Sequence, residues 1–350
     1  MMQTVKGFIL LGLVVILWVG SSTLIQTILE DTNFNKPFFL TYFSTSLFSL
    51  YFIDIFRRRQ DIRNEVLPGL RFTAIKAAQF CPLWFGANYL YNLSLTLTSI
   101  ASSTILSSTS GIFTLLLSIF LIKASPDVFK FLAVLVSFGG TVCIAMSDWN
   151  TQSETALGDI LALSGAVVYA LYCIFISKVG ESVYLPHLFA FVGAINFVCL
   201  MPLFAVLNYT GVETFKFPDG EVLGFLFLNG LFGTVLSDVL WAFSVKFLNP
   251  ALSTLGITLT IPLSMVVDAI IDDMSYSVVY IFGAIFIVFG FFIMAMFEHP
   301  TIGPKISNKG LKERFCKKYS DDVDFENQIL IKKHEKTEET TPCDDTQKSL

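Results

Sequence analysis

Ten apolar runs, each long enough to cross a bilayer, limit most strongly what this chain can fold into. A helix needs about 20 mainly apolar residues to span the hydrocarbon core of a membrane. The connections between the runs are short. The predicted spans are residues 7–29, 37–56, 72–93, 99–122, 128–147, 157–178, 187–208, 222–246, 251–271 and 277–297. The sequence therefore predicts an all-α integral membrane protein with ten transmembrane helices.

Composition supports the same class. The 350 residues are 54% hydrophobic and 15% charged, and the mean hydropathy is +0.67, which excludes an ordinary soluble protein. The first run follows Lys6, and a positively charged residue also precedes the apolar part of a signal peptide. The run is too long for a signal peptide, however, and it has a later counterpart that begins at Gly158, so we expect a true span. The net charge of -5 says little about partners, and we expect no nucleic-acid partner.

The distribution of lysine and arginine predicts the orientation, because cytoplasmic loops carry an excess of both. With a cytoplasmic N-terminus, the outer side holds Lys36 and Lys216. The inner side then holds Lys6, Arg57, Arg58, Arg59, Arg63, Arg71, Lys123, Lys130, Lys178 and Lys246. An even number of spans places both termini in the cytoplasm.

An internal repeat appears when the chain is shifted by 150 positions. The shift places Asn88 on Asp238 and Tyr91 on Trp241. Identical pairs include Ser94 and Ser244, Ser103 and Ser253, Thr104 and Thr254, and Gly140 and Gly290. Each half holds five spans, an odd number, so the halves are inverted in the membrane, as in many transporters. We therefore predict repeats at 1–147 and 148–297; two unrelated apolar halves is the alternative.

The last segment, 298–350, is a predicted disordered, charged cytoplasmic tail, because it has too few aliphatic residues to bury a core. Within it, Glu326, Leu330 and Ile331 have the form of an acidic dileucine signal for a sorting adaptor.

Hydroxyl side chains are concentrated at the start of the fourth span. They are Ser99, Ser102, Ser103, Thr104, Ser107, Ser108, Thr109 and Ser110. Such hydroxyls can bond to backbone carbonyls one turn earlier, and small residues let helices approach closely. The stretch should face other helices or a wet cavity, and Ser107 and Ser110 are candidate solute contacts. Close packing without a ligand is the alternative.

Ionisable groups within membrane spans are costly and point to function. Asp238 has no nearby route to water along its helix, so we predict a role in solute binding or coupling, against a buried helix–helix hydrogen bond. Asp268 is a weaker candidate because it can belong to the acidic outer rim. Lys76 can reach the cytoplasmic headgroups with its long side chain.

Polar and aromatic residues at similar depth complete the candidate set. They are Gln79, Asn88, Trp84 and Trp241. Aromatic residues also anchor helices at membrane interfaces without any ligand. Pro82 and Pro262 are each expected to break a helix locally. The sequence contains no catalytic constellation, cofactor motif or metal-ligand spacing, so we predict neither an enzyme nor a cofactor.

Several segments together resemble the drug/metabolite transporter superfamily. They are residues 35–42, 80–85 with Asn88, 101–110, 237–241, and 260–265 with Asp268. More specifically, the chain is similar to subfamily F of solute carrier family 35, which includes fungal thiamine-repressible transport proteins. The resemblance covers residues 7–297. It implies ten helices in two inverted repeats and a solute transporter of an intracellular membrane that works by alternating access.

We compare three hypotheses for the function of this chain. The first is a secondary carrier of a small organic metabolite, with polar or cationic solutes favoured because Asp238 and the aromatic residues suit a cation. The second is a nucleotide-sugar antiporter, which would need several cations inside the membrane. The third is a non-transporting scaffold or regulator acting through the tail. A vacuolar, lysosomal or Golgi membrane is favoured, a mitochondrial one stays open, and the sequence is compatible with a homodimer.

Overall fold

The computed structural model describes residues 2–32, 36–63, 67, 69–95, 97–98, 100–124, 127–147, 156–211, 213–214, 217–271 and 276–297. They belong to one compact unit, Met1–His299. The second unit, Pro300–Leu350, lies outside the described residues, and with it the tail and the sorting pattern at Glu326, Leu330 and Ile331. The described part of the chain is helical and contains no strand.

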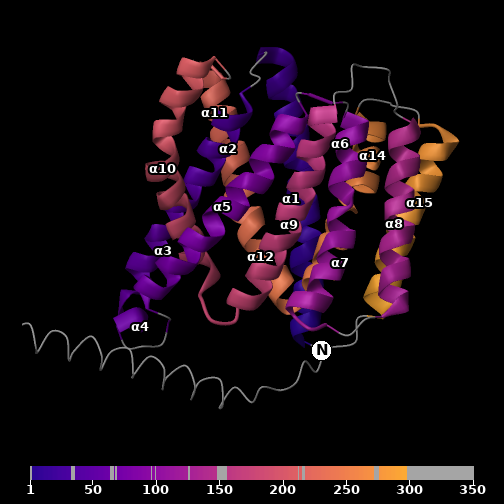
Figure 1. Cartoon of the computed structure of the whole chain (residues 1–350), viewed down its shortest axis with the longest axis horizontal. Helices are drawn as coiled ribbons and strands as arrows, with labels where there is room; N and C mark the ends of the chain where they lie inside the picture. The colour runs from indigo at the N-terminus through magenta and orange to yellow at the C-terminus, as the bar shows by residue number, and fades with distance from the viewer. Residues whose placement is uncertain are drawn as a thin grey trace, which may run out of the picture. The chain divides into compact units, whose positions relative to one another are not determined.

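The helices run alternately up and down one bundle (Figure 1). They are α1 (Met2–Thr32), α2 (Pro37–Ser46), η1 (Leu47–Tyr51), α3 (Phe52–Arg57), α4 (Arg59–Arg63), α5 (Leu70–Ser94), α6 (Ile100–Ser108), α7 (Ser110–Leu121), α8 (Val128–Ser147), α9 (Ala156–Val179), α10 (Leu185–Thr210), α11 (Gly220–Asn229), η2 (Gly230–Leu236), α12 (Ser237–Phe247), α13 (Pro250–Ile257), α14 (Thr260–Ile271) and α15 (Val278–Met296). We call the end at which α1 begins the near end, and the opposite end the far end.

Nine helical segments of the described chain are long and apolar enough to span a membrane. The third predicted span corresponds to α5, a helix of 25 residues that is not among the nine. It carries Arg71, Lys76, Gln79, Asn88 and Asn92, which lower its hydropathy. It nevertheless packs between α9 and α10 inside the bundle. The membrane class is confirmed, and the count of ten spans stays a prediction.

Four of the predicted spans are not uniform α-helices. A 3₁₀ turn, η1, interrupts the second, and a π-helical turn, η2, interrupts the eighth. The fourth span changes from α6 to α7 at Thr109, and the ninth from α13 to α14 at Thr258 and Leu259. The last two breaks lie about 150 residues apart, as the repeat predicts. Departures of this kind within α-helices are frequent at functional sites.

The prolines behave differently from the expectation. The helix α5 continues through Pro82, so the predicted break there is wrong. Pro262 is the third residue of α14, in the first turn, where a missing N–H removes no bond that the helix would otherwise make. The ninth span therefore breaks just before its proline.

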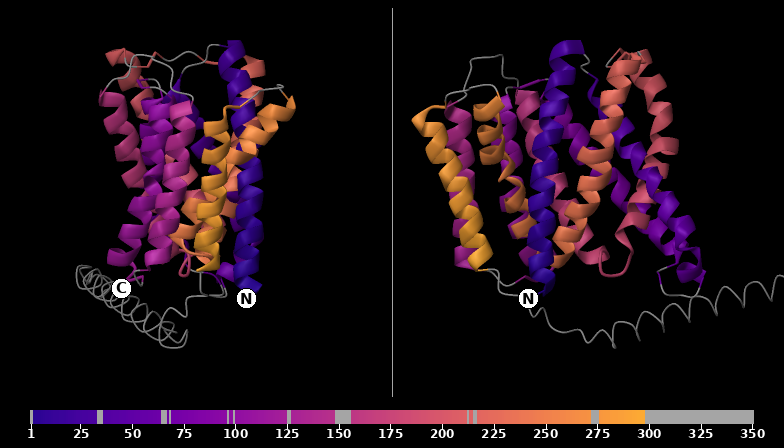
Figure 2. Two further views of the ribbon diagram at one scale, coloured as in Figure 1. Left: turned by 90° about the vertical axis from the view of Figure 1, so that its right-hand side faces the viewer. Right: turned by 180° about the vertical axis from the view of Figure 1, so that it is seen from behind.

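The repeats exchange their first helices. The first helix of the chain, α1, packs against α11, α12, α13 and α14 of the second half, and α9 packs against α5, α6 and α7 of the first half. Figure 2 shows α1 beside α12 in the view from behind. The predicted boundaries at 147 and 297 therefore describe the sequence, whereas in space the two halves interlock.

Small residues bring α8 and α15 into backbone contact. A Cβ atom added at Gly140 would lie 2.5 Å from the carbonyl oxygen of Gly283, and one at Gly283 would lie 2.6 Å from that of Gly140. One on Gly290 would lie 2.7 Å from the carbonyl oxygen of Ala133. Close approach through glycine is a common way for membrane helices to associate.

Candidate functional site

Asp238 lies in the interior of the bundle, two residues after the last residue of the π-helical turn. Its side chain is 4% exposed, and it is the second residue of α12. The turn places Val235 so that its carbonyl oxygen accepts a hydrogen bond of 2.8 Å from the hydroxyl of Tyr51. Next to Asp238, the hydroxyl of Ser237 accepts a 2.9 Å bond from Nε1 of Trp18 and donates to the carbonyl of Gly233. These bonds join α1 to α12 and η1 to η2 next to this carboxyl group.

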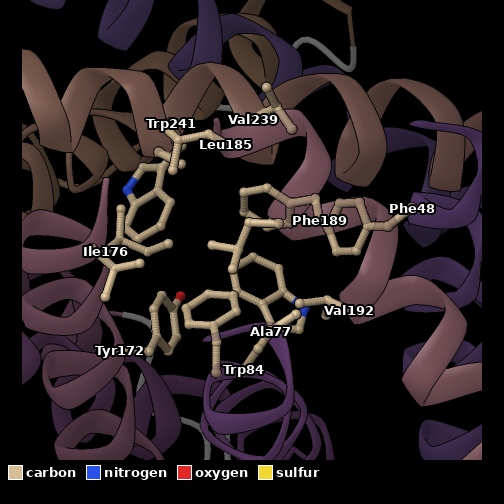
Figure 3. Packing of buried hydrophobic residues seen from close by; sticks show 14 of the residues in the cluster. Phe48, Ala77, Trp84, Tyr172, Ile176, Leu185, Phe189, Val192, Val239 and Trp241 are labelled. Carbon is tan, nitrogen blue, oxygen red and sulfur yellow. The ribbon is translucent and has the colours of Figure 1, made fainter. Parts of the chain in front are cut away.

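Aromatic rings from three helices meet close to Asp238. The rings of Trp84 on α5 and Tyr172 on α9 have centroids 5.1 Å apart. Trp241 on α12 lies 5.5 Å from Tyr172 and 6.4 Å from Trp84. Tyr169, one turn before Tyr172, lies 6.2 Å from Trp241. We call these four residues the aromatic cluster; Figure 3 shows Trp84, Tyr172 and Trp241 converging from separate helices.

Two polar atoms of the aromatic cluster are buried without a hydrogen-bond partner. They are Nε1 of Trp241 and the hydroxyl oxygen of Tyr169, which lies beside Cys173 and Tyr172 without a well-formed hydrogen bond to either. Buried donors in native proteins are nearly always paired, so each such atom needs an explanation. Asp238 interacts electrostatically with Tyr51, Tyr169 and Tyr172. The interior thus combines one carboxyl group, several π-faces and two donors that a bound solute could satisfy.

Four of the six candidate residues of the first half lie in the aromatic cluster, are hydrogen-bonded to it, or lie on helices that pack against one of its helices. Trp84 belongs to it. Asn88, the counterpart of Asp238 in the repeat, is half-buried and donates to the carbonyl of Trp84 at 2.9 Å. Ser107 and Ser110 are half-buried on α6 and α7, and the hydroxyl of Ser107 donates to the carbonyl of Thr104 at 3.1 Å. Both helices pack against α9, the helix that carries Tyr169 and Tyr172.

Lys76 and Gln79 lie apart from the aromatic cluster. Nζ of Lys76 donates to Oε1 of Gln79 at 3.2 Å, and it lies 5.6 Å from the ring centroid of Phe72. Gln79 is exposed and Lys76 half-buried, so this pair faces away from the buried core. The side chain of Asp268 lies outside the described residues.

Tyr169 and Tyr172 were missed by the sequence analysis. Apolar spans commonly contain tyrosine, and the 150-residue shift places Val19 and Ser22 opposite them, so neither composition nor the repeat marks them. Their importance depends on the exchange of α1 and α9 between the halves. Among the described residues, no three histidine, cysteine, aspartate or glutamate side chains come together to hold a metal ion.

A family model of known proteins matches both halves of this arrangement. The model of the EamA-like transporter family matches residues 5–146 and again residues 156–296. The chain belongs to the EamA-like transporter family. The double match corresponds to the repeat, and the EamA-like protein has its candidate carboxyl group in the second copy and Trp84 in the first.

Several curated relatives resemble this EamA-like transporter. An uncharacterised vacuolar membrane protein of Saccharomyces cerevisiae is 34% identical over 351 residues, which cover 82% of this chain and 89% of that one. The thiamine-repressible mitochondrial transport protein THI74 of the same yeast is 32% identical, covering 82% and 90%. Solute carrier family 35 member F5 of Mus musculus is 38% identical over 240 residues, which cover 65% of this chain but only 46% of the carrier. The similarity to subfamily F is confirmed.

One solved crystal structure shares the fold. It superposes with a TM-score of 0.63 and covers 85% of this chain and 98% of the other. The sequences are 16% identical, so the likeness concerns the fold alone.

Proposed function

We propose that this EamA-like protein is a secondary carrier of small organic cations that also bear a hydrogen-bond acceptor. The observation that carries the proposal is the burial of Asp238 beside the aromatic cluster, with two donors left unpaired. A carboxylate gives a cation its counter-charge, and the faces of tryptophan and tyrosine add cation–π attraction. The N–H of Trp241 and the O–H of Tyr169 would each gain a partner if the solute also carried an acceptor oxygen or nitrogen.

A nucleotide sugar fits this interior less well. Such a solute carries at least two negative charges, and anions of this kind are recognised by arginine and lysine. Among the described residues, the buried polar and charged set includes no lysine or arginine. Lys76 is the cation that the sequence analysis placed within a span, and its ammonium group contacts Gln79 and the ring of Phe72 instead. We therefore rank nucleotide-sugar exchange second, and a scaffold role through the tail third.

Alternating access is the mechanism that we propose for this carrier. Asp238, Trp84 and Trp241 are each at most 4% exposed, so the site is closed to both sides in this structure. Inverted repeats open such a site to each side in turn by moving one set of helices against the other. The breaks at Thr109 and at Thr258 supply bending points in related positions of the two halves.

The proposed location is an endomembrane with both termini in the cytoplasm. The lysine and arginine excess at the near end supports this orientation. A vacuolar membrane is favoured because the yeast relative at 34% identity is named for it.

The test is counterflow in proteoliposomes that contain the purified protein. Vesicles preloaded with choline or 1-methylnicotinamide, two cations that carry an acceptor oxygen, should accumulate the radiolabelled form of at least one of them, whereas vesicles preloaded with UDP-sugars should accumulate none. Asp238→Asn should reduce the cation signal at least about tenfold, since a charge-assisted contact is worth about 1.5–3 kcal/mol. Asp219→Asn is the matched control, because Asp219 is exposed at the far end.

Counterflow of UDP-sugars without any cation counterflow would reverse the ranking. Cation counterflow that survives Asp238→Asn unchanged would remove the site from the proposal while leaving the carrier function.

A further inference from the structure

A second cluster of polar groups lies at the near end, where α3 of the first half meets α10 of the second half. Nε2 of His187 lies 3.3 Å from Oδ2 of Asp54. The other carboxylate oxygen, Oδ1, accepts from Nε of Arg58 at 3.1 Å. The ring of Tyr184 lies under the guanidinium of Arg58 at 5.0 Å and meets the ring of His187 edge-on at 4.7 Å.

Burial makes the contact between His187 and Asp54 unusual. His187 is 1% exposed, and both Nε2 of His187 and Oδ2 of Asp54 are buried without a well-formed hydrogen bond. A nitrogen and a carboxylate oxygen at this separation need one proton between them to be satisfied. A second proton on the ring would convert the pair to an imidazolium and a carboxylate. Histidine is the side chain that makes this change near neutral pH.

The groups that face His187 come from each neighbouring element. Asp54 and Arg58 approach from α3 and its end, Tyr51 from η1, and Tyr184 from the residue before α10. At the end of α12, Lys246 interacts with Glu181. The helix α5 contributes apolar Ala77 and Phe80 to the same core, and its Lys76 faces Gln79. Asp54 is therefore the anion in contact with the imidazole ring.

Tyr51 is close to both this pair and the proposed solute site. It interacts electrostatically with Asp238 and also with Asp54 and Tyr184. Its hydroxyl is anchored on the carbonyl of Val235, in the π-helical turn just before Asp238. A change in charge at His187 and Asp54 can thus reach the turn that positions Asp238.

We propose that His187, paired with Asp54, is the proton-binding site that couples a pH gradient to transport. A proton from the aqueous phase binds the imidazole, and the imidazolium pairs with the Asp54 carboxylate and holds α3 against α10 at the near end. Loss of that proton weakens the contact between the two halves and permits the near end to open. The inference rests on the proposed carrier function, but its test does not require a transported solute.

The first measurement follows the protonation of His187 directly. The chain has three histidines, so nitrogen-15 imidazole spectra of the full chain in nanodiscs hold three ring systems, and His187→Gln identifies one of them. The His187 signal should change from imidazolium to neutral imidazole between about pH 5 and 8. Asp54→Asn should displace that change, whereas Asp61→Asn, which removes an exposed carboxylate of α4, should not.

The second measurement follows opening of the near end. A thiol introduced by Ser182→Cys, in the connection between α9 and α10, should react with a membrane-impermeant maleimide, and mass spectrometry follows position 182 alone because the chain has six native cysteines. Since only the thiolate reacts, each rate is divided by the rate of the same thiol in the unfolded protein at the same pH. This normalised labelling rate should be about fivefold or more higher at pH 8 than at pH 5, a size typical of coupled sites. Adding His187→Gln, which keeps an N–H donor for Asp54 but binds no proton in this range, should make the normalised labelling rate independent of pH. A His187 signal that never changes charge, or one that changes while labelling stays constant, overturns the proposal. Both results are independent of whether any cation is transported.

Discussion

The hydroxyl oxygens of Ser94 and Ser103 lie 3.2 Å apart, and those of Ser244 and Ser253, each 150 residues later, lie 3.5 Å apart. The first pair joins α5 to α6 at the far end, and the second joins α12 to α13 at the near end (Figure 1). The same contact therefore occurs in both repeats at opposite ends of the bundle. This relationship is what an inverted repeat requires.

Each serine pair should contribute a small and similar coupling energy. Double-mutant cycles with Ser94→Ala and Ser103→Ala, and with Ser244→Ala and Ser253→Ala, should each give about 0.6 kcal/mol, the average for hydrogen bonds between membrane helices. Unfolding in mixed detergent measures the free energies. The mixed cycle of Ser94→Ala with Ser253→Ala is the control, and it should be additive because the sites lie at opposite ends. Coupling in one half only would contradict equivalence of the repeats.

Neighbouring glycines on α8 should respond very differently to alanine. A Cβ atom on Gly140 would meet Gly283 and Ile287 of α15, whereas one on Gly139 has no neighbour within 4 Å. Gly140→Ala should lower the free energy of unfolding by about 1–3 kcal/mol, because overpacking forces the backbones apart. Gly139→Ala should be neutral or slightly stabilising, since alanine favours helix. Equal effects, measured by thermal unfolding in detergent, would show that α8 and α15 do not pack as described.

Glu213 should stabilise the start of α2 from the far end of α10. Its two carboxylate oxygens accept from the backbone N–H groups of Phe38 and Phe39 at 2.9 and 3.1 Å. The first N–H groups of an α-helix have no carbonyl acceptor within the helix itself. Glu213→Gln keeps one acceptor but loses the charge, and should destabilise the protein by about 1 kcal/mol. Glu221→Gln, an exposed acid on α11, is the control for thermal unfolding. An identical melting curve for both variants would exclude a capping role.

Tyr184 should make stability fall at high pH. Burial, followed by the nearby Asp54 carboxylate, raises the pKa of this phenol above its ordinary value of 10.0. The folded state therefore keeps the proton longer than the unfolded state, and the stability it contributes below pH 10 is lost as pH rises through the raised pKa. Tyr184→Phe should reduce the fall in unfolding free energy between about pH 9 and 11. An unchanged pH dependence in Tyr184→Phe would show that the phenol titrates normally.

The sequence was sufficient for the membrane class, the repeat and the buried Asp238, because apolar runs and the 150-residue shift are local or periodic signals. The partners of Asp238 were not predictable in the same way. Tyr169 and Tyr172 bring the second half into contact with Trp84 of the first half because α9 packs against α5, and this exchange leaves no mark in composition. His187 and Asp54 lie 133 residues apart, at span ends where charged residues are ordinary. The prediction of a helix break at Pro82 was wrong because it considered proline alone. Packing against α9 and α10 stabilises α5 as a continuous helix.

Solute-dependent thermal stabilisation of the purified protein and of Asp238→Asn tests the central claim most directly. A ligand that binds the folded state raises its stability in proportion to the logarithm of its concentration over its dissociation constant. Organic cations with an acceptor group should raise the melting temperature of the unaltered protein and leave Asp238→Asn unmoved, while UDP-sugars move neither. Stabilisation by UDP-sugars, or by cations equally in both proteins, would contradict a cation site at Asp238.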